Sequence, residues 1–323
     1  MTGNKLPDFS SCLKFMIAAR KHLLYFYRKQ GSDDAANADI DVERQANILK
    51  SLVERSYMHD GVSCYVLKNI PQEGLPTYAD QTYMGLEIVI VPQVHALSRE
   101  EQNTLVRMMV ASQQSRPIRL FIGMISWDVD RERKMSGDVE TTLSSRITLE
   151  DWLKHKFWLA CYEPFENELV SPMRESTPEP LKNIRYTDVH ANRSIHRYIL
   201  DVMIHLRMHR LVDTTKGGGV HTGSSADVLE LSQMIAIYKY KKKFVTPDHV
   251  KQACIWYFPM HLELLTSSLM DTSIMYGSKP ELVDGLLSRI AEVKLKESVE
   301  LENPLFLETL VVRDVLKKVV PPV

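Results

Sequence analysis

Two histidines are the first candidates for chemistry, because His205 and His209 lie four residues apart in a stretch with helical spacing. That spacing places both imidazoles on one face of a helix, as in many zinc sites. The zinc-protease motif also needs a glutamate directly after the first histidine, and Leu206 stands there instead. No third ligand follows from the spacing, so we expect a polar helix face and neither a metal nor another cofactor.

Basic side chains gather between Arg193 and Lys251, where ten lysines and arginines stand against five aspartates and glutamates. The densest part surrounds Tyr240 with four lysines: Lys239, Lys241, Lys242 and Lys243. Lysines interleaved with aromatic rings can bind a single-stranded nucleic acid. The alternative is a solvated turn between helices, whose cations complement the C-terminal end of the preceding helix dipole.

Large apolar side chains raise a different candidate, a contact with another protein. Trp256, Tyr257 and Phe258 are consecutive, and Phe306 opens an apolar stretch that continues to Val319. Core packing is the default explanation of the consecutive aromatic residues, whereas exposed aromatic side chains would favour an interface. The C-terminal stretch is too apolar to remain exposed, so this chain or another one must bury it.

Two further patterns predict no chemistry. Lys216 precedes three glycines at 217–219, as in a phosphate-binding nest, but no predicted strand comes before them, so we expect a flexible connector. The four cysteines are scattered and form no Cys-x-x-Cys pair. They predict reduced, buried thiols and neither a zinc site nor a disulfide framework.

The composition sets the broad class of protein. The chain has 323 residues, of which 44% are hydrophobic and 25% charged, and its net charge is −1. These values are typical of a globular protein with a core, and they exclude a global basic field that would draw the chain to nucleic acid. No apolar run reaches the ~18 residues that a membrane-spanning helix needs, and the N-terminus lacks a secretory signal. We therefore expect no membrane span and a location in the cytoplasm, the nucleus or both.

Buried strands are the first of the elements that position these residues. Leu86–Val91 and Ile118–Ile125 are continuous apolar runs, typical of a parallel sheet that is covered on both faces. The helix between them begins at Ser98, with Glu101 as its capping-box partner, so the three segments predict a βαβ unit. We predict further strands at 62–67 and 157–162 and a helix at 8–28.

Several segments resemble, in the same order, parts of AAA+ ATPases, most closely the branch of MoxR proteins and the ATPase subunit of magnesium chelatase. Leu86–Met109 resembles the Walker B strand and its following helix, Leu120–Trp127 the sensor-one strand, and Leu149–Pro164 the arginine-finger element. Residues 219–262 resemble the lid of that family. The resemblance implies an α/β protein: a parallel-sheet AAA+-like core with flanking helices, followed by a C-terminal helical lid domain.

The resemblance also predicts domain boundaries. We expect the core at residues 1–165, a linker at 166–192 and the lid at 193–265. A C-terminal helical extension at 266–323 would then pack on the core.

The residues that carry ATP hydrolysis in that family are replaced in this chain. The phosphate-binding motif Gly-x-x-x-x-Gly-Lys-Ser/Thr occurs nowhere, and residues 4–30, where we expect its loop, contain no glycine. By the resemblance, the positions of the Walker B acidic pair, sensor one, the arginine finger and sensor two hold Pro92, Gln93, Ser126, Lys156 and Gly223. Phosphoryl transfer depends on positioned charges and a magnesium ion. We therefore expect no ATPase activity and no bound cofactor.

Longer phrases resemble the fungal family called maintenance of telomere capping protein 2, nearly from end to end. They include LPDFSSCLKF from Leu6, RYILDVMIHLRMHRL from Arg197, CIWYFPMHLEL from Cys254 and ENPLFLETLVVRDVLKKVVPPV from Glu302. The resemblance implies a role in keeping telomeres capped and no established enzymatic activity. We therefore expect a non-catalytic pseudo-ATPase scaffold with protein partners, present as a monomer or in a small complex. The alternative is a nucleic-acid-binding module that uses the basic region of the lid.

Overall fold

The structure is a computed structural model of the whole chain. It describes residues 6–29, 35–57, 62–71, 85–114, 117–128, 139–162, 186–300 and 303–322. The chain divides into two compact units. Residues 7–130 and 147–164 form the α/β unit, and residues 1–6, 131–146 and 165–323 form the helical unit. Residues 166–185 of the predicted linker lie outside the described residues.

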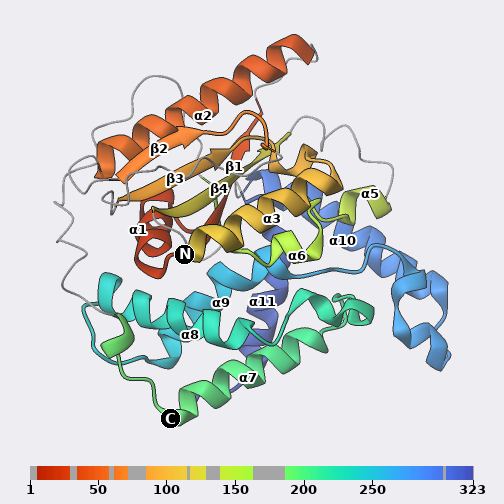
Figure 1. Ribbon diagram of the computed structural model, residues 1–323. Helices are drawn as coiled ribbons and strands as arrows, with labels where there is room; N and C mark the ends of the chain where they lie inside the picture. Colours follow the sequence, from red (N-terminus) through yellow and green to blue (C-terminus); the bar gives the residue numbers. More distant parts are fainter. Residues whose placement is uncertain are drawn as a thin grey trace. The chain divides into compact units, whose positions relative to one another are not determined.

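A parallel sheet forms the centre of the α/β unit (Figure 1). Its strands are β1 (His22–Arg28), β2 (Val62–Val66), β3 (Leu86–Val91), β4 (Ile118–Trp127) and β5 (Phe157–Tyr162). Within the described residues the sheet has five strands in the order β2-β3-β4-β1-β5, and every neighbouring pair is parallel. The mixed α/β class with a parallel sheet and flanking helices is therefore confirmed.

The N-terminal prediction of one helix from residue 8 to residue 28 is wrong. Helix α1 (Phe9–Ala19) begins at Asp8, whose Oδ2 accepts a hydrogen bond of 2.8 Å from the backbone of Ser11. It ends at Arg20, which has a left-handed φ of 55°, the usual conformation of a helix C-cap. Strand β1 follows and takes a central place in the sheet. Six of its seven residues are buried, so it lacks the alternation that identifies a half-exposed strand.

Helices cover the sheet on both sides in Figure 1, with α2 (Ala35–Tyr57) on one side and α3 (Arg99–Gln114) on the other. Helix α2 contacts β2, α3 contacts β4 and the short helix α6 (Asp151–Lys154), and α1 contacts β1 and β5. The predicted capping box of α3 is confirmed. The backbone of Ser98 donates to Glu101 Oε2 at 2.8 Å, and the backbone of Glu101 donates to Ser98 Oγ at 3.3 Å.

The helical unit is built from longer helices joined by short turns. In chain order its elements are α5 (Val139–Leu143), η3 (Tyr186–Asp188), α7 (Arg193–Arg207), η4 (Thr214–Gly219), α8 (Ser224–Met234), the π-helical turn η5 (Ile235–Lys239), α9 (Pro247–His261), η6 (Ser268–Met270), η7 (Thr272–Tyr276), α10 (Pro280–Glu300) and α11 (Phe306–Lys318). As predicted, α9 begins at Pro247 directly after its cap, Thr246. Helix α11 packs on α7, α9 and α10, so helices of its own unit bury much of the apolar C-terminal stretch.

The three glycines after Lys216 belong to η4 and do not form the expected flexible connector. Each of Gly217, Gly218 and Gly219 has a positive φ, between 67° and 73°. The backbone of Glu263 donates to the carbonyl oxygen of Gly218 at 3.1 Å, so the turn is held against the end of α9.

No helix of the described residues is long and apolar enough to cross a membrane.

Candidate functional site

Strand order identifies one edge of the sheet as the place for a ligand. The connection after β1 leads to β2 at one end of the sheet, and the connection after the neighbouring strand β4 leads to β5 at the other end. Because parallel crossovers are right-handed, the helices that follow these strands lie on opposite faces (Figure 1): α2 after β1 on one, and α6 after β4, in contact with α3, on the other. A crevice between neighbouring strands of this kind is where open α/β sheets bind ligands, outside the carboxyl ends of the strands.

Three of the sequence-predicted positions lie at this edge. Pro92 and Gln93 follow β3, and Ser126 is the penultimate residue of β4. Gln93 has a left-handed φ of 46°, a conformation that non-glycine residues adopt rarely and often at functional sites. The carboxyl ends of β3 and β4 are neighbours in the sheet, so Pro92, Gln93 and Ser126 lie in one region of the α/β unit.

Ser126 and Gln93 gather around residues that the sequence did not single out. The hydroxyl of Ser126 lies 3.3 Å from Nε2 of His95, a hydrogen-bonding distance. Burial raises the pKa of Tyr27, on β1, to about 12, and the polar side chains of Ser126 and Gln93 near its hydroxyl act in the opposite direction. The Asp41 carboxylate, on α2, raises the Tyr27 pKa further. We call Tyr27, Gln93, His95 and Ser126 the edge cluster.

The edge cluster is made of neutral groups. Burial lowers the pKa of His95 below its usual value, which favours the uncharged imidazole, and the raised pKa of Tyr27 keeps its hydroxyl protonated at neutral pH. In the part of the chain that the structure describes, no three His, Cys, Asp or Glu side chains lie together as a metal ion would require. The cluster can exchange hydrogen bonds, but it offers neither the lysine nor the paired carboxylates of a phosphoryl-transfer site.

The connection after β1, where the resemblance would put a phosphate-binding loop, does not coincide with the expected residues 4–30. Since β1 ends at Arg28 and α2 begins at Ala35, the corresponding connection covers residues 29–34 and not residues 4–30. Its residues 30–34 lie outside the described part of the chain. It reads Lys-Gln-Gly-Ser-Asp-Asp, with two aspartates directly before the helix. Carboxylates in this place would repel a phosphate.

The other two predicted positions do not join the edge cluster. Lys156 directly precedes β5 and lies near His22, the first residue of β1. Burial lowers the pKa of His22 to about 3, and the charge of Lys156 contributes to that shift. Lys156 is therefore at the amino ends of the strands, the opposite edge of the sheet. Gly223 caps α8 in the helical unit.

The two histidines do not share one helix face, because His205 lies on α7 whereas His209 lies two residues beyond its end. Nδ1 of His205 lies 2.8 Å from the carbonyl oxygen of Asp201. Nε2 of His209 lies 3.1 Å from Oδ2 of Asp314, and its Nδ1 accepts a hydrogen bond from the backbone of Leu211. Both rings are thus engaged within the unit in different ways.

The four lysines of the basic region lie at the end of η5 and on the exposed turn that leads to α9. Lys239, Lys241, Lys242 and Lys243 are all exposed. Tyr240 is 46% exposed and Phe244 52% exposed. Nζ of Lys239 lies 5.7 Å from the ring centre of Tyr240, and Nζ of Lys242 lies 5.7 Å from that of Phe244. We call these six residues the basic turn.

The aromatic residues that were candidates for a protein contact are buried. Trp256, Tyr257, Phe258 and Phe306 are at most 8% exposed, so the default of core packing describes them. The hydroxyl of Tyr257 lies 3.0 Å from Oδ2 of Asp227 and 3.2 Å from Nε2 of His221. These aromatic side chains therefore offer no surface to a partner.

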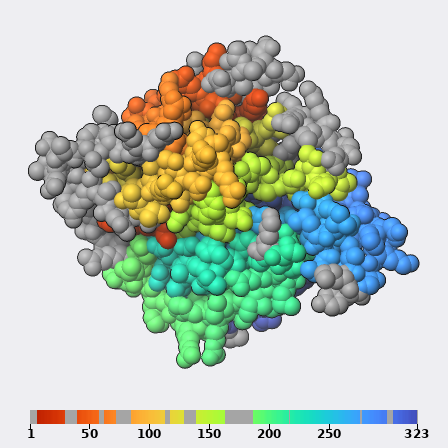
Figure 2. Space-filling model, turned by 45° about the vertical axis from the view of Figure 1, so that its right-hand side comes forward, coloured from red at the N-terminus to blue at the C-terminus, as the bar shows by residue number. Residues whose placement is uncertain are grey.

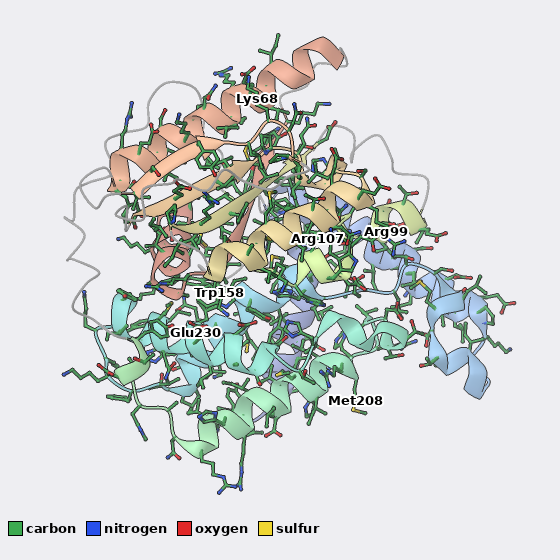
Figure 3. The ribbon with its side chains drawn as sticks, viewed as in Figure 1. Lys68, Arg99, Arg107, Trp158, Met208 and Glu230 are labelled. Atoms are coloured by element: carbon green, nitrogen blue, oxygen red, sulfur yellow. The ribbon has the colours of Figure 1, made fainter. Side chains whose placement is uncertain are left out.

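A different apolar surface was missed. Leu200, Ile204 and Met208 are 48%, 51% and 76% exposed, and they follow one another at intervals of four residues along and just beyond α7. Figure 3 shows Met208 projecting away from the end of that helix. The opposite face of α7 buries the residues that the sequence predicted there, Ile195, Ile199, Val202 and Leu206. The sequence did contain a signal for this second apolar face, because its three residues also follow one another at helical spacing. We call Leu200, Ile204 and Met208 the α7 row.

Comparisons with known proteins assign the family. A family model described as "Maintenance of telomere capping protein 2, N-terminal domain" matches residues 7–162, which cover most of the α/β unit. A Zygosaccharomyces rouxii protein named maintenance of telomere capping protein 2 is 67% identical over 323 residues, all of both chains. Proteins of the same name are 38% identical over 366 aligned positions in Saccharomyces cerevisiae, covering all of both chains, and 31% identical over 354 in Vanderwaltozyma polyspora, covering 99% of each. The chain therefore belongs to the maintenance of telomere capping protein 2 family.

Proposed function

We propose that the chain is a non-catalytic pseudo-ATPase that serves telomere capping as a scaffold for protein contacts. The names of its relatives support the pathway. The sheet supports the ancestry, because β3 and β4, the segments that resemble the Walker B and sensor-one strands, are neighbours and β1 lies next to β4. The connection after β1 and the residues after β3 and β4 therefore share one edge, as a nucleotide site would need.

The chemistry of that edge supports the loss of catalysis. By the resemblance, Pro92 and Gln93 stand at the positions of the Walker B acidic pair. The hydroxyl of Ser126, at the sensor-one position, lies 3.3 Å from Nε2 of His95, whose lowered pKa favours the neutral ring. A magnesium ion prefers carboxylate oxygens, and Asp41, the acidic side chain that raises the pKa of Tyr27, comes from a helix and not from the end of β3. Such a site lacks the electrostatic stabilisation on which phosphoryl transfer depends.

The α7 row is the observation that carries the scaffold proposal. Large apolar side chains at intervals of four residues form an apolar stripe along one face of a helix. Such a stripe is a surface against which an amphipathic helix of another protein can pack. Isolated exposed apolar residues need no explanation, whereas a continuous row favours an interaction site. The green surface of this helix is open to solvent in Figure 2.

Charge beside the α7 row indicates the chemistry of the partner. Among residues 193–210 the exposed charged side chains are Arg193, Arg197, Asp201 and Arg210, so arginines outnumber acids. Complementary charge favours and orients a protein partner. The proposed occupant is an amphipathic helix of another protein, with aliphatic side chains on one face and flanking glutamates or aspartates.

Site-specific crosslinking tests this proposal. A photo-crosslinking amino acid at position 204, in cells that express the chain at native level, is expected to trap one protein through an acidic amphipathic segment. The double variant Leu200→Glu, Met208→Glu should abolish that crosslink. The matched control places the crosslinker at Leu282, an apolar residue of α10 that is 68% exposed, and should trap no such protein. Equal yields from positions 204 and 282, or a product that survives the double variant, would contradict the proposal.

The basic turn favours a second function, binding of single-stranded nucleic acid. Its four exposed lysines alternate with two half-exposed rings, which is the combination that single-strand binders use for the phosphates and the bases. Its small size and the net charge of −1 make this the weaker proposal.

Salt dependence tests the second function. If the turn binds single strands, the variant Lys241→Glu, Lys242→Glu, Lys243→Glu should weaken binding of an oligonucleotide and reduce the slope of log K against log salt by about 2. Lys279, Lys296 and Lys317 are exposed lysines elsewhere in the helical unit, and changing those three to glutamate makes the same change in net charge. Equal loss in both triple variants would exclude a site at the basic turn.

A further inference from the structure

A small acidic cavity in the helical unit has no role in the function proposed above. Its volume is about 180 Å³. The residues around it come from the end of α5 and the segment after it, the start of η4, the segment after α9, η6 and α11: Leu143, Ser144, Ser145, Asp213, Leu262, Glu263, Leu264, Thr266, Met270 and Glu308. Three of them are acidic, and among the described residues that line the cavity none is a lysine, an arginine or a histidine.

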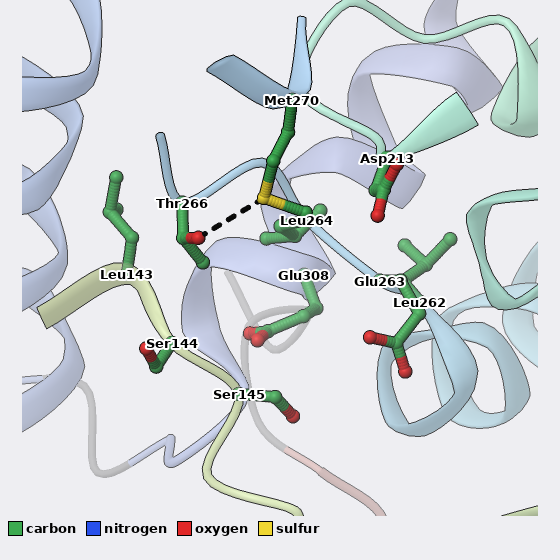
Figure 4. Close-up of a pocket in the computed structure, with 10 residues that line it drawn as sticks. All are labelled: Leu143, Ser144, Ser145, Asp213, Leu262, Glu263, Leu264, Thr266, Met270 and Glu308. Carbon is green, nitrogen blue, oxygen red and sulfur yellow. Dashed lines mark hydrogen bonds between the residues drawn. The ribbon is translucent and has the colours of Figure 1, made fainter. Parts of the chain in front are cut away.

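Glu308 is buried, and one of its carboxylate oxygens has no hydrogen-bond partner among the described residues. Its residue is 3% exposed, and its Oε2 accepts no hydrogen bond from any residue that the structure describes. In Figure 4 the side chain extends from α11 and its carboxylate points into the ring of lining residues. A buried carboxylate that lacks a hydrogen-bond donor costs folding free energy, so its presence in a cavity indicates that a donor from outside the chain belongs there.

Helix capping does not account for Glu308. It is the third residue of α11, the position from which a glutamate in a capping box accepts the backbone N–H of the N-cap residue. That N–H, on Leu305, instead donates to Oδ1 of Asn303 at 2.9 Å. The N–H of the N-cap residue is therefore satisfied without Glu308, while the helix dipole still favours a negative charge in this first turn.

Two nearby cations donate hydrogen bonds to backbone oxygens. Nζ of Lys294 donates to the carbonyl oxygens of Leu143 and Ser144, at 3.4 Å and 3.2 Å. The guanidinium of Arg146 donates to the carbonyl oxygen of Pro304. On the opposite wall, Asp213 accepts the backbone and hydroxyl hydrogens of Thr215, both through Oδ1, which leaves Oδ2 for another donor.

We propose that this cavity binds the cationic end of a ligand, an ammonium or a guanidinium group, with Glu308 as its principal anion. A group with several N–H donors matches carboxylate oxygens that approach from α11 and from the start of η4. The cavity is smaller than the ~300–1,000 Å³ of most sites for drug-sized molecules, so it has room for one such group and a short alkyl stem. A divalent cation fits less well, because no three acidic or histidine side chains among the described residues converge as metal ligands.

The two sources of this cation are a basic side chain of another polypeptide and a free small amine. Their shared chemistry is tested first, with n-butylguanidinium and its neutral, nearly isosteric counterpart n-butylurea. Calorimetric titration of the purified full chain should show saturable binding of n-butylguanidinium and at least tenfold weaker binding of n-butylurea. Comparison with a capped Gly-Arg-Gly peptide then separates the sources. Peptide binding within threefold of n-butylguanidinium indicates a protein side chain, and much weaker peptide binding indicates a free amine.

Glu308→Gln is the decisive variant, because it keeps the shape of the side chain and removes its charge. It should weaken n-butylguanidinium binding at least tenfold. Its melting temperature should be unchanged or higher, since a buried unpaired charge has been removed. The matched control is Glu281→Gln, a first-turn glutamate of α10 that is exposed, and it should leave binding unchanged. Equal affinities for the cation and the urea, no loss in Glu308→Gln, or calcium binding that depends on Glu308 would each overturn the proposal.

Discussion

Glu87 on β3 and Arg119 on β4 are register partners in the sheet, and Oε2 of the glutamate lies 2.7 Å from Nε of the arginine. Their side chains are 3% and 6% exposed, so the ion pair is inside the α/β unit. The free-energy cost of removing two charges from water is offset by their mutual attraction, and only while both partners are present.

Removing one partner of this ion pair should therefore destabilise the chain strongly. Arg119→Met is expected to lower the free energy of unfolding by about 3–5 kcal/mol, because it leaves Glu87 charged and buried. The double variant Glu87→Leu, Arg119→Met should recover most of that loss, since no charge remains. Urea unfolding measures all three proteins, and additive losses in the double variant would show that the two residues do not interact.

Acid should destabilise the chain through His22. Burial, with smaller contributions from the charges of Lys156 and Lys21, lowers the pKa of His22 from 6.5 to about 3, and Nδ1 accepts a hydrogen bond of 3.1 Å from the backbone of Phe121. Between these two pKa values the unfolded chain binds a proton that the folded chain does not. This part of the stability is complete above pH 6.5 and is lost as the pH falls toward about 3, by up to ~1.4 kcal/mol per pH unit.

The His22→Asn variant tests this acid dependence. It keeps an acceptor for the Phe121 backbone and should remove about one proton from the pH slope of unfolding between pH 6 and pH 4. His196→Asn, at an exposed position of α7, should leave the slope unchanged. Identical slopes in the wild type and His22→Asn would place the acid sensitivity elsewhere.

Two glycines of η4 should respond very differently to substitution by alanine. A Cβ at Gly219 would lie 1.8 Å from the carbonyl oxygen of His261, whereas a Cβ at Gly217 would meet open space. Both have positive φ, so strain of about 1–2 kcal/mol is common to both variants. Gly219→Ala should cost roughly 1–3 kcal/mol more than Gly217→Ala, because atoms must move. Thermal melting compares them, and equal shifts would show that η4 does not pack on the end of α9.

The C-terminal helix should stabilise the chain through its buried face. Phe306 is 3% exposed and Val320 is 82% exposed. Phe306→Ala should therefore lower the free energy of unfolding by about 3–5 kcal/mol, and Val320→Ala should change it by less than about 0.5 kcal/mol. Deleting residues 302–323 should lower the melting temperature sharply. An unchanged melting curve after that deletion, with loss of a binding partner, would assign the segment to an interface instead.

Continuous apolar runs and helix caps made much of the fold predictable. Strands β3 and β4 could be read from uninterrupted aliphatic residues, and the starts of α1, α3 and α9 from Asp8, Ser98 and Thr246. Strand β1 could not, because a fully buried strand of seven residues has no period that separates it from a helix. Because β1 was not predicted, the connection after it was not recognised, and a phosphate-binding loop was expected at residues 4–30.

Members of the edge cluster could be predicted only where they follow from the end of a recognised strand, because the ends of neighbouring parallel strands lie close together. Gln93 and Ser126 were placed together through the resemblance, but Tyr27 and His95 were not, because they join the edge cluster through tertiary contacts. Whether an apolar residue is exposed also depends on its neighbours in space. Trp256 and Leu200 are both large apolar residues within helices, yet Trp256 is 8% exposed and Leu200 is 48% exposed.

The level of single-stranded DNA at chromosome ends is the most direct measurement of whether the surface or the edge cluster carries the function. It should be compared in yeast whose own family member is replaced by this chain or by its variants. Leu200→Glu, Ile204→Glu, Met208→Glu should raise single-stranded DNA to the level of a gene deletion. Gln93→Asn, Ser126→Ala, in which asparagine tolerates the left-handed backbone, should keep the wild-type level. Full capping by the α7 variant, with loss of capping in the edge-cluster variant, would contradict a non-catalytic scaffold.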